Sequence, residues 1–281
     1  GLPFVGVGWY RTEFDVPQFQ AGKRATILFD GAMSHANVYI NGQKVGYWPY
    51  GYNSFHFDIT KYLKPGEKNT LAVRLENLPE SSRWYPGAGL YRNVHLIITE
   101  DAYIPVWGTY ITTPSVNEKF AKVNVRTKVV LPEGADPAKY SVETSVWNPN
   151  KQKLTAVRTS LAQMKYNNNQ AEQEFVIQAP SLWSPEMPAL YSAETRLYEG
   201  DKLKDIYTTP FGIRSIEIIP DKGFFLNGKR TVFKGVCNHH DLGPLGAAVN
   251  DAAIRRQIRI LKDMGCNAIR TSRNMPAPEL I

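Results

Sequence analysis

Cysteine is scarce in this sequence, because only Cys237 and Cys266 occur among 281 residues. Two thiols cannot build the disulfide framework of a small secreted module, so we expect two free, buried thiols. Long apolar runs are also missing, and none approaches the roughly 20 residues that a membrane-spanning helix needs. The sequence therefore predicts no membrane partner.

Blocks of one charge are missing as well. The chain has 33 Lys and Arg against 26 Asp and Glu, a net charge of +7, but the basic residues are scattered among acidic ones. A nucleic-acid-binding protein needs a basic stripe that follows the phosphates. We therefore expect no nucleic-acid partner.

The opening residues, GLPFVG, lack the basic and apolar segments of a secretion signal. A strand-like stretch, GWYRTEFDV, follows almost at once. We expect that a leader or a further domain once preceded it, which leaves the cellular compartment open.

What the sequence has is 43% apolar residues, 12% aromatic residues and 19 prolines, a composition typical of a turn-rich β protein. Residues 1–101 hold short segments of period-two alternation, such as RATILFDGA and HANVYINGQKVGYW. Asn41-Gly42 predicts a type I′ hairpin turn between two of them. This pattern indicates a first β-sandwich.

Residues 102–213 continue with strands at the spacing of an immunoglobulin-like sandwich, separated by turns such as PEGADP. The cysteine pair of antibody domains is missing, so the likeness is one of architecture. Residues 214–281 differ: after a second Asn-Gly hairpin they predict a strand over 231–237, a helix over 251–264 and a strand over 267–271. Two parallel strands cannot close a barrel, so we expect the chain to stop inside a third domain.

The predicted helix has clear ends and one apolar face. Asn250 or Asp251 can cap its start, and Gly265 is placed to end it. The apolar face consists of Ile254, Ile258, Leu261 and Met264.

Several motifs resemble glycoside hydrolase family 2, the β-galactosidases, β-glucuronidases and β-mannosidases, and its Bacteroides-type β-galactosidases above all. They run in family order as GWYRTEF, DGAMSHANVYINGQKVGYWPYGYNSFHFDIT, RWYPGAGLYRNVHL, LWSPEMPALY, FGIRSIE, GFFLNGKRTVFKGVCNHHD and LKDMGCNAIRTSRNMPAPEL. The resemblance implies a mainly β chain: a jelly-roll sugar-binding domain over 1–101, an immunoglobulin-like sandwich over 102–213, and the start of a truncated (β/α)8 TIM barrel over 214–281.

Strand ends carry the candidate site, because active sites of such barrels lie at the C-terminal ends of the strands. Asn238, His239, His240 and Asp241 follow the first strand. We favour a sugar-contacting or wall role for at least one histidine. A zinc site is a weaker alternative, because an extended run points alternate side chains in opposite directions, and a structural role is the third. Both histidines can face inward only if the strand has ended.

Arg270 closes the second strand at the same rim. The resemblance implies that its guanidinium holds the nucleophilic carboxylate ionised, and a solvated or salt-bridged arginine is the plainer alternative. Beyond it, Arg273 stands where the family has histidine, next to Asn274. Arg273 can donate hydrogen bonds to a sugar but cannot titrate.

A loop of the first domain supplies two further candidates, Arg83 and Trp84. The resemblance implies that this loop reaches the barrel pocket, although relatives carry an acidic sugar ligand near position 83. Arg83 can bind hydroxyls or an acidic group, and Trp84 can stack on a pyranose ring. Packing of Trp84 between domains is the alternative.

The implied reaction is retaining hydrolysis of terminal β-D-galactosides, which needs two carboxylates about 5 Å apart. The family takes both glutamates from later barrel strands, so no catalytic residue is expected before residue 281, and the chain alone should be inactive. Glu279 is expected at a helix N-terminus and not as an acid or base. We expect no cofactor in this chain, and whether the parent enzyme uses Mg or Na ions stays open.

Two classes of function remain open at this point. One is a fragment of a β-galactosidase-like hydrolase, with β-glucuronidase or β-mannosidase as alternative specificities of the parent. The other is a non-catalytic carbohydrate-binding or interaction module. In both, the partner is a carbohydrate, and a homo-oligomer is possible because the barrel edge would be exposed. The resemblance suggests export or a periplasmic location in a Gram-negative bacterium.

Overall fold

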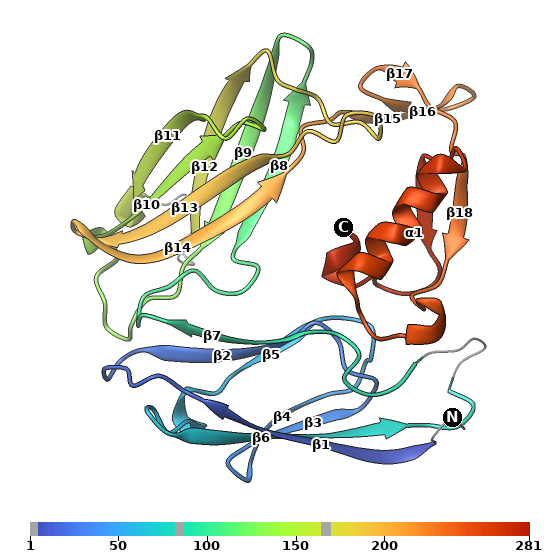
Figure 1. Ribbon diagram of the computed structural model, residues 1–281. Coiled ribbons are helices and arrows are strands. Elements are labelled where there is room, and N and C mark those ends of the chain that lie inside the picture. Colours follow the sequence, from blue (N-terminus) through green and yellow to red (C-terminus); the bar gives the residue numbers. More distant parts are fainter. Residues whose placement is uncertain (1–4, 82–86, 164–169) are drawn as a thin grey trace. The chain divides into compact units, whose positions relative to one another are not determined.

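The computed structural model describes residues 5–81, 87–163 and 170–281 (Figure 1). It divides into two compact units. The first unit joins residues 1–98 to residues 233–281, and the second comprises residues 99–232. The boundaries expected at residues 101 and 213 stay predictions.

The first unit begins with a sandwich of two antiparallel sheets, which Figure 1 shows as two layers. One sheet has the order β1-β6-β3-β4 and the other β5-β2-β7. The strands are β1 (Gly6–Asp15), β2 (Arg24–Phe29), β3 (Ala36–Ile40), β4 (Gln43–Trp48), β5 (Phe55–Asp58), β6 (Lys68–Asn77) and β7 (Val94–Thr99). Strict alternation of buried and half-buried residues along β3 and β6 places one face of their sheet in the core.

The Asn41-Gly42 turn is confirmed. It joins β3 to β4 through two residues, with φ of 50° at Asn41 and 80° at Gly42. Both angles lie in the left-handed region, as a type I′ turn requires. The turn matches the twist of its strands and so fixes the register of the hairpin.

The second unit contains a sandwich of one four-stranded sheet, β11-β10-β13-β14, and one three-stranded sheet, β12-β9-β8. Its strands are β8 (Thr109–Val116), β9 (Phe120–Lys128), β10 (Tyr140–Trp147), β11 (Lys153–Ser160), β12 (Gln170–Gln178), β13 (Tyr191–Glu199) and β14 (Lys202–Phe211). In place of a disulfide, the Gln173 amide of β12 donates to the carbonyl oxygens of Val142 and Val157 in the opposite sheet, at 3.0 and 2.9 Å.

A small sheet of β15 (Ile216–Ile219), β16 (Gly223–Leu226) and β17 (Lys229–Arg230) ends the second unit. Its Asn227-Gly228 turn has two positive φ angles, as predicted from the sequence. Asn227 also accepts from the Ser215 amide and donates to the Trp183 carbonyl oxygen, both at 3.0 Å. The turn therefore anchors the hairpin to the preceding loop.

The last part of the chain is the predicted βαβ element, formed by β18 (Gly235–Asn238), α1 (Asp251–Asp263) and β19 (Ala268–Thr271). The strands pair in parallel, from Gly235 beside Ala268 to Asn238 beside Thr271. The Asn250 side chain caps α1 by accepting from the Ala253 amide at 3.0 Å, and Gly265 follows the helix with φ of 94°. Both helix-end predictions are confirmed.

Two details of that prediction were wrong. The strand expected over 231–237 begins only at Gly235, because β19 offers a pairing partner no earlier than Ala268, and Val232 and Phe233 are exposed instead. Met264 does not share the buried helix face, since α1 ends one residue before it. No helix among the described residues is long and apolar enough to cross a membrane.

Candidate functional site

The site lies where β18 and β19 end side by side. Gly235 makes their pairing possible, because a Cβ atom there would lie 2.5 Å from the Ala268 carbonyl oxygen. Residues 239–250 leave one strand and residues 272–281 leave the other. The candidate residues of both segments therefore share one edge of the two-stranded sheet.

The two faces of this small sheet carry different candidates. Asn238 is half-buried on the face toward α1, where its amide donates to Gln257 Oε1 at 3.4 Å. Arg270 and Cys237 are exposed on the opposite face, with Nη1 3.8 Å from Sγ. The expectation that both cysteines are buried is thus wrong for Cys237, since the side chain alternates away from the helix; Cys266 is half-buried, and both thiols are free.

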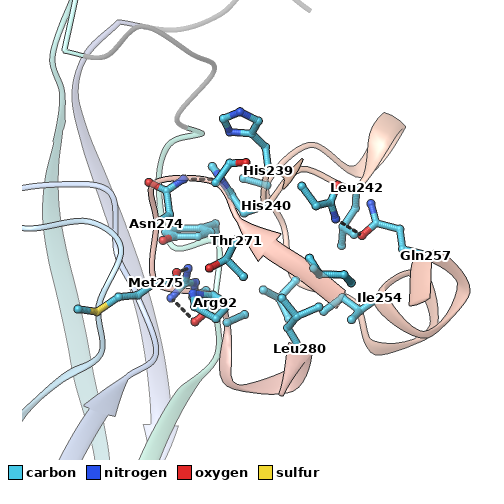
Figure 2. Close-up of a pocket in the computed structure, with 18 residues that line it drawn as sticks. Arg92, His239, His240, Leu242, Ile254, Gln257, Thr271, Asn274, Met275 and Leu280 are labelled. Atoms are coloured by element: carbon cyan, nitrogen blue, oxygen red, sulfur yellow. Dashed lines mark hydrogen bonds between the residues drawn. The ribbon is translucent and has the colours of Figure 1, made fainter. Parts of the chain in front are cut away.

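The two histidines follow the end of β18 at Asn238. Their side chains therefore need not point to opposite faces, as neighbours in a strand do. His239 is exposed and projects outward in Figure 2, whereas the His240 ring lies half-buried between tyrosines of the first sandwich. Its centroid is 5.3 Å from that of Tyr52 and 6.0 Å from that of Tyr91. His240 Nδ1 is 3.4 Å from the Asn274 amide nitrogen. His240 therefore packs between the segment after β18 and the first sandwich, whereas the His239 ring points outward.

Both histidines line a cavity of about 40 Å³ (Figure 2). Its floor is apolar and includes Ile254 of α1, Ile269 of β19 and Leu280. The space admits a few water molecules and no sugar ring. The cavity is therefore a packing gap behind the strand ends, on the helix side.

Arg92 is a buried residue that the sequence reasoning missed. Its Nη1 donates to the carbonyl oxygens of Asp30 and Tyr52, at 3.1 and 2.9 Å, and to that of Pro276 at 3.4 Å. Its Nη2 donates to the Met275 carbonyl oxygen at 2.7 Å. One guanidinium thus joins the first sandwich to the segment after β19. The signal was an arginine inside the GLYRNVHL motif, next to a strand-like run.

Tyr91 reinforces the same junction. Burial raises the pKa of its hydroxyl well above the ordinary value, so the group stays protonated and donates to the Gly51 carbonyl oxygen at 2.6 Å. The Tyr91 carbonyl oxygen accepts from the Val249 amide at 2.9 Å. Gly87 approaches closely as well, since a Cβ atom there would lie 2.5 Å from the Ala247 side chain. Both segments of the site edge are therefore anchored to the first sandwich.

The remaining predicted residues are spread along the rim. Asp241 is exposed, and its carbonyl oxygen accepts from the Gln257 amide at 3.2 Å. Arg273 is exposed with φ of 63°, beside the half-buried Asn274. Arg83 and Trp84 lie outside the described residues.

Glu279 lies in the first turn of a short 3₁₀ helix, Pro278–Leu280, as expected for a residue at a helix N-terminus. The Asn93 amide donates to its Oε1. Glu279 is thus bound to the first sandwich. Among the described ranges there is no group of three or more His, Cys, Asp and Glu able to hold a metal ion, so we assign no metal ligands to them.

Comparison with known proteins explains this arrangement. Residues 3–100 match the sugar-binding domain of glycosyl hydrolases family 2. Residues 103–214 match the domain model that is called simply glycosyl hydrolases family 2, and residues 217–280 match the TIM barrel domain of that family. The three matches follow one another through nearly the whole chain. The chain therefore belongs to glycosyl hydrolases family 2, and it carries the first two domains and the start of the barrel.

Named relatives differ in specificity. The chain is 45% identical over 277 residues to Beta-galactosidase BoGH2A of Bacteroides ovatus, covering 98% of this chain and 32% of that protein. It is 34% identical to a Beta-glucuronidase of Bacteroides fragilis, over 94% and 39% of the two chains. A crystal structure of a family 2 member from Bacteroides cellulosilyticus DSM 14838 superposes with a TM-score of 0.91 at 36% identity, over 99% and 38%. The chain thus spans about a third of the length of these relatives.

Proposed function

We propose that this chain is part of a retaining glycoside hydrolase that removes terminal β-D-galactosyl residues. The observation that carries the proposal is the 45% identity to a β-galactosidase across nearly the whole chain. The position of Arg270 supports it, because the exposed guanidinium at the end of β19 faces away from α1. On that side it can pair with a carboxylate contributed by later barrel strands.

The candidate residues take different roles in this proposal. Arg270 is a positioning residue that keeps a nucleophilic glutamate ionised, and exposed His239, Asp241 and Arg273 are the groups that reach the sugar. Asn238, His240 and Asn274 hold the strand-end segments in place, which their contacts with Gln257, Tyr52 and one another support. Arg83 and Trp84 are proposed as sugar contacts from the first domain.

The 281-residue chain itself is proposed to be inactive. Retaining hydrolysis needs a nucleophile and an acid/base about 5 Å apart. The chain supplies two strands, β18 and β19, of the eight that close a (β/α)8 barrel, and Glu279 is engaged by Asn93. Asp241 is the other carboxylate described at this edge, and a single carboxylate cannot supply both roles.

A second specificity has its own support. A β-glucuronidase relative is 34% identical, and exposed Arg273 offers a guanidinium that pairs well with a sugar carboxylate. The two substrates differ in the group at C6, which is a carboxylate in the glucuronide, and in the configuration at C4, so hydrolysis rates of the two nitrophenyl glycosides separate the two specificities.

The test uses the protein encoded by the complete gene, purified beside the 281-residue chain. We expect the complete protein to hydrolyse nitrophenyl β-D-galactoside faster than the β-D-glucuronide, and the short chain to hydrolyse neither. Arg270→Ala should lower kcat at least about a hundredfold, because it removes a charge that holds the nucleophile ionised. A preference for the glucuronide would refute the galactoside assignment, and turnover by the pure short chain would refute the assignment of inactivity.

A further inference from the structure

The sheet β1-β6-β3-β4 has a second face that is turned away from the core. On β6, Leu71, Val73 and Leu75 are buried, so Ala72 and Arg74 point outward. Pairing carries this orientation to the neighbouring strands. We call the following residues the outer face: Val7, Trp9, Arg11, His35, Asn37, Tyr39, Lys44, Tyr47, Ala72, Arg74 and Glu76.

Aromatic rings are exposed at both sides of the outer face. Trp9 on β1 is 59% exposed and Tyr47 on β4 is 46% exposed. The Trp9 and Tyr39 rings meet with centroids 5.6 Å apart across β6, where the short side chain of Ala72 leaves room for them. At the other side, the Tyr47 hydroxyl is 2.7 Å from His35 Nδ1. The rings are therefore held in place by neighbours although they are open to solvent.

Register aligns polar groups between these rings. Trp9 pairs with Arg74, Arg74 pairs with Asn37, and Asn37 pairs with Tyr47, so one residue from each strand forms a row. The row spans about 14 Å, or three strand spacings. Arg74 Nη1 is bonded to Glu76 Oε1 at 2.5 Å, which fixes the guanidinium in the middle of the row.

This chemistry fits a sugar chain better than a protein surface. A protein-binding patch is centred on a broad area of contiguous apolar side chains. Here the apolar contact between Trp9, Tyr39 and Ala72 is bordered by Arg74 and Asn37, which donate hydrogen bonds. Pyranose rings offer both an apolar face for stacking and hydroxyl groups at their edges. Exposed aromatic rings bury large area at low entropic cost, and Arg74, Asn37 and Glu76 match the hydroxyl groups.

We propose that the outer face binds a β-linked galacto-oligosaccharide of about three sugar rings along this row. Trp9 and Tyr39 stack on one ring, Arg74 and Asn37 bind hydroxyls of the next, and Tyr47 contacts the last. The site is separate from the strand ends of β18 and β19, and it binds without hydrolysis. The choice of galactosyl units rests on the proposed function, and the match of residues 3–100 to a sugar-binding domain supports carbohydrate as the ligand class.

Isothermal titration of the 281-residue chain with β-1,4-galactotetraose tests the proposal. We expect binding that Trp9→Ala and Tyr39→Ala each weaken about tenfold, because each removes one stacked ring. Arg74→Gln should weaken it by a smaller factor while leaving both rings. The matched control is Tyr110→Ala, since Tyr110 is 63% exposed on β8 in the second sandwich and should leave the affinity unchanged. Free galactose should bind at least tenfold more weakly than the tetraose, because it reaches only one part of the row.

Three results would overturn the proposal. One is no measurable binding of the tetraose by the folded chain, and another is equal loss of affinity in Trp9→Ala and Tyr110→Ala. The third is a dimer in sedimentation that Trp9→Ala converts to a monomer, which would make the outer face an interface between copies. Circular dichroism of each variant confirms that it is folded. Hydrolysis by the complete protein is independent of these results, so either proposal can fail alone.

Discussion

Removing the Arg92 side chain should separate the strand-end segment from the first sandwich. Arg92 is 6% exposed and its guanidinium donates to four backbone carbonyl oxygens, two of which belong to Met275 and Pro276. Its carbon chain also packs on Gly31, where a Cβ atom would lie 2.8 Å from Arg92 Cδ. Arg92→Ala leaves those carbonyl oxygens buried with fewer donors.

The expected cost is about 3–5 kcal/mol in the free energy of unfolding of the first unit. Each hydrogen bond from a charged donor contributes roughly 1.5–3 kcal/mol, and the four share one desolvated group, so they do not add. Arg92 Nε has no acceptor among the described residues, which lowers the net gain. Arg92→Lys should recover only part of the lost stability. A single ammonium group cannot reach all the acceptors that the two terminal nitrogens of the guanidinium bind.

Urea unfolding and hydrogen exchange measured by mass spectrometry check this prediction. In Arg92→Ala, peptides spanning residues 272–281 should lose protection, while peptides of β9 in the second unit should not change. The matched control is Arg158→Ala. Arg158 also donates to a carbonyl oxygen, that of Gly200, and lies over the Tyr198 ring at 4.2 Å, but it is exposed and should contribute less than about 1 kcal/mol. A smaller effect at Arg92 than at Arg158, or uniform loss of protection, would refute the reasoning.

Two further predictions concern a helix cap and an ion pair. Asn250→Ala should destabilise the first unit by about 1 kcal/mol, because it removes the hydrogen bond from the Ala253 amide, whereas Asn250→Asp should keep that bond and the stability. The midpoints of urea unfolding test this prediction, and equal midpoints for the two variants would contradict the cap. The Lys204 ammonium, 2.8 Å from Asp101 Oδ1, holds the pKa of that carboxyl below its usual value. The folded pKa is therefore the lower one, so this stabilisation is present above pH 3.8 and is lost as the pH falls through the folded value. Lys204→Met should weaken the dependence of the unfolding free energy on pH in the acid range, as measured by urea unfolding at a series of pH values. An unchanged dependence would mean that the ion pair contributes nothing to stability.

Local rules predicted the parts of the fold that local chemistry determines. The turns at Asn41-Gly42 and Asn227-Gly228, the Asn250 cap and the stop at Gly265 each depend on a few adjacent residues, and the structure has all of them. The start of β18 depends on where β19 offers a partner, about 30 residues further on. That is why the strand was predicted too long.

The candidate site was less accessible to sequence reasoning. The motif after β18 indicated which segment matters, but not which way each side chain points. Asn238 turned out to face α1, and His240 packs between Tyr52 and Tyr91 of a different domain. Arg92 was overlooked for the same reason, because its acceptors come from residues far away in the sequence.

During synthesis of the protein, Arg92 is made long before two of its four carbonyl partners. Its acceptors at Met275 and Pro276 lie 183 and 184 residues downstream, and the whole second sandwich is translated between them. At about 5–20 residues per second, the ribosome delivers these partners roughly 10–40 seconds after Arg92 itself. During that interval the first sandwich holds an arginine with half of its carbonyl partners. The nascent chain therefore carries a charged, half-paired surface at the place where the strand-end segment will later dock.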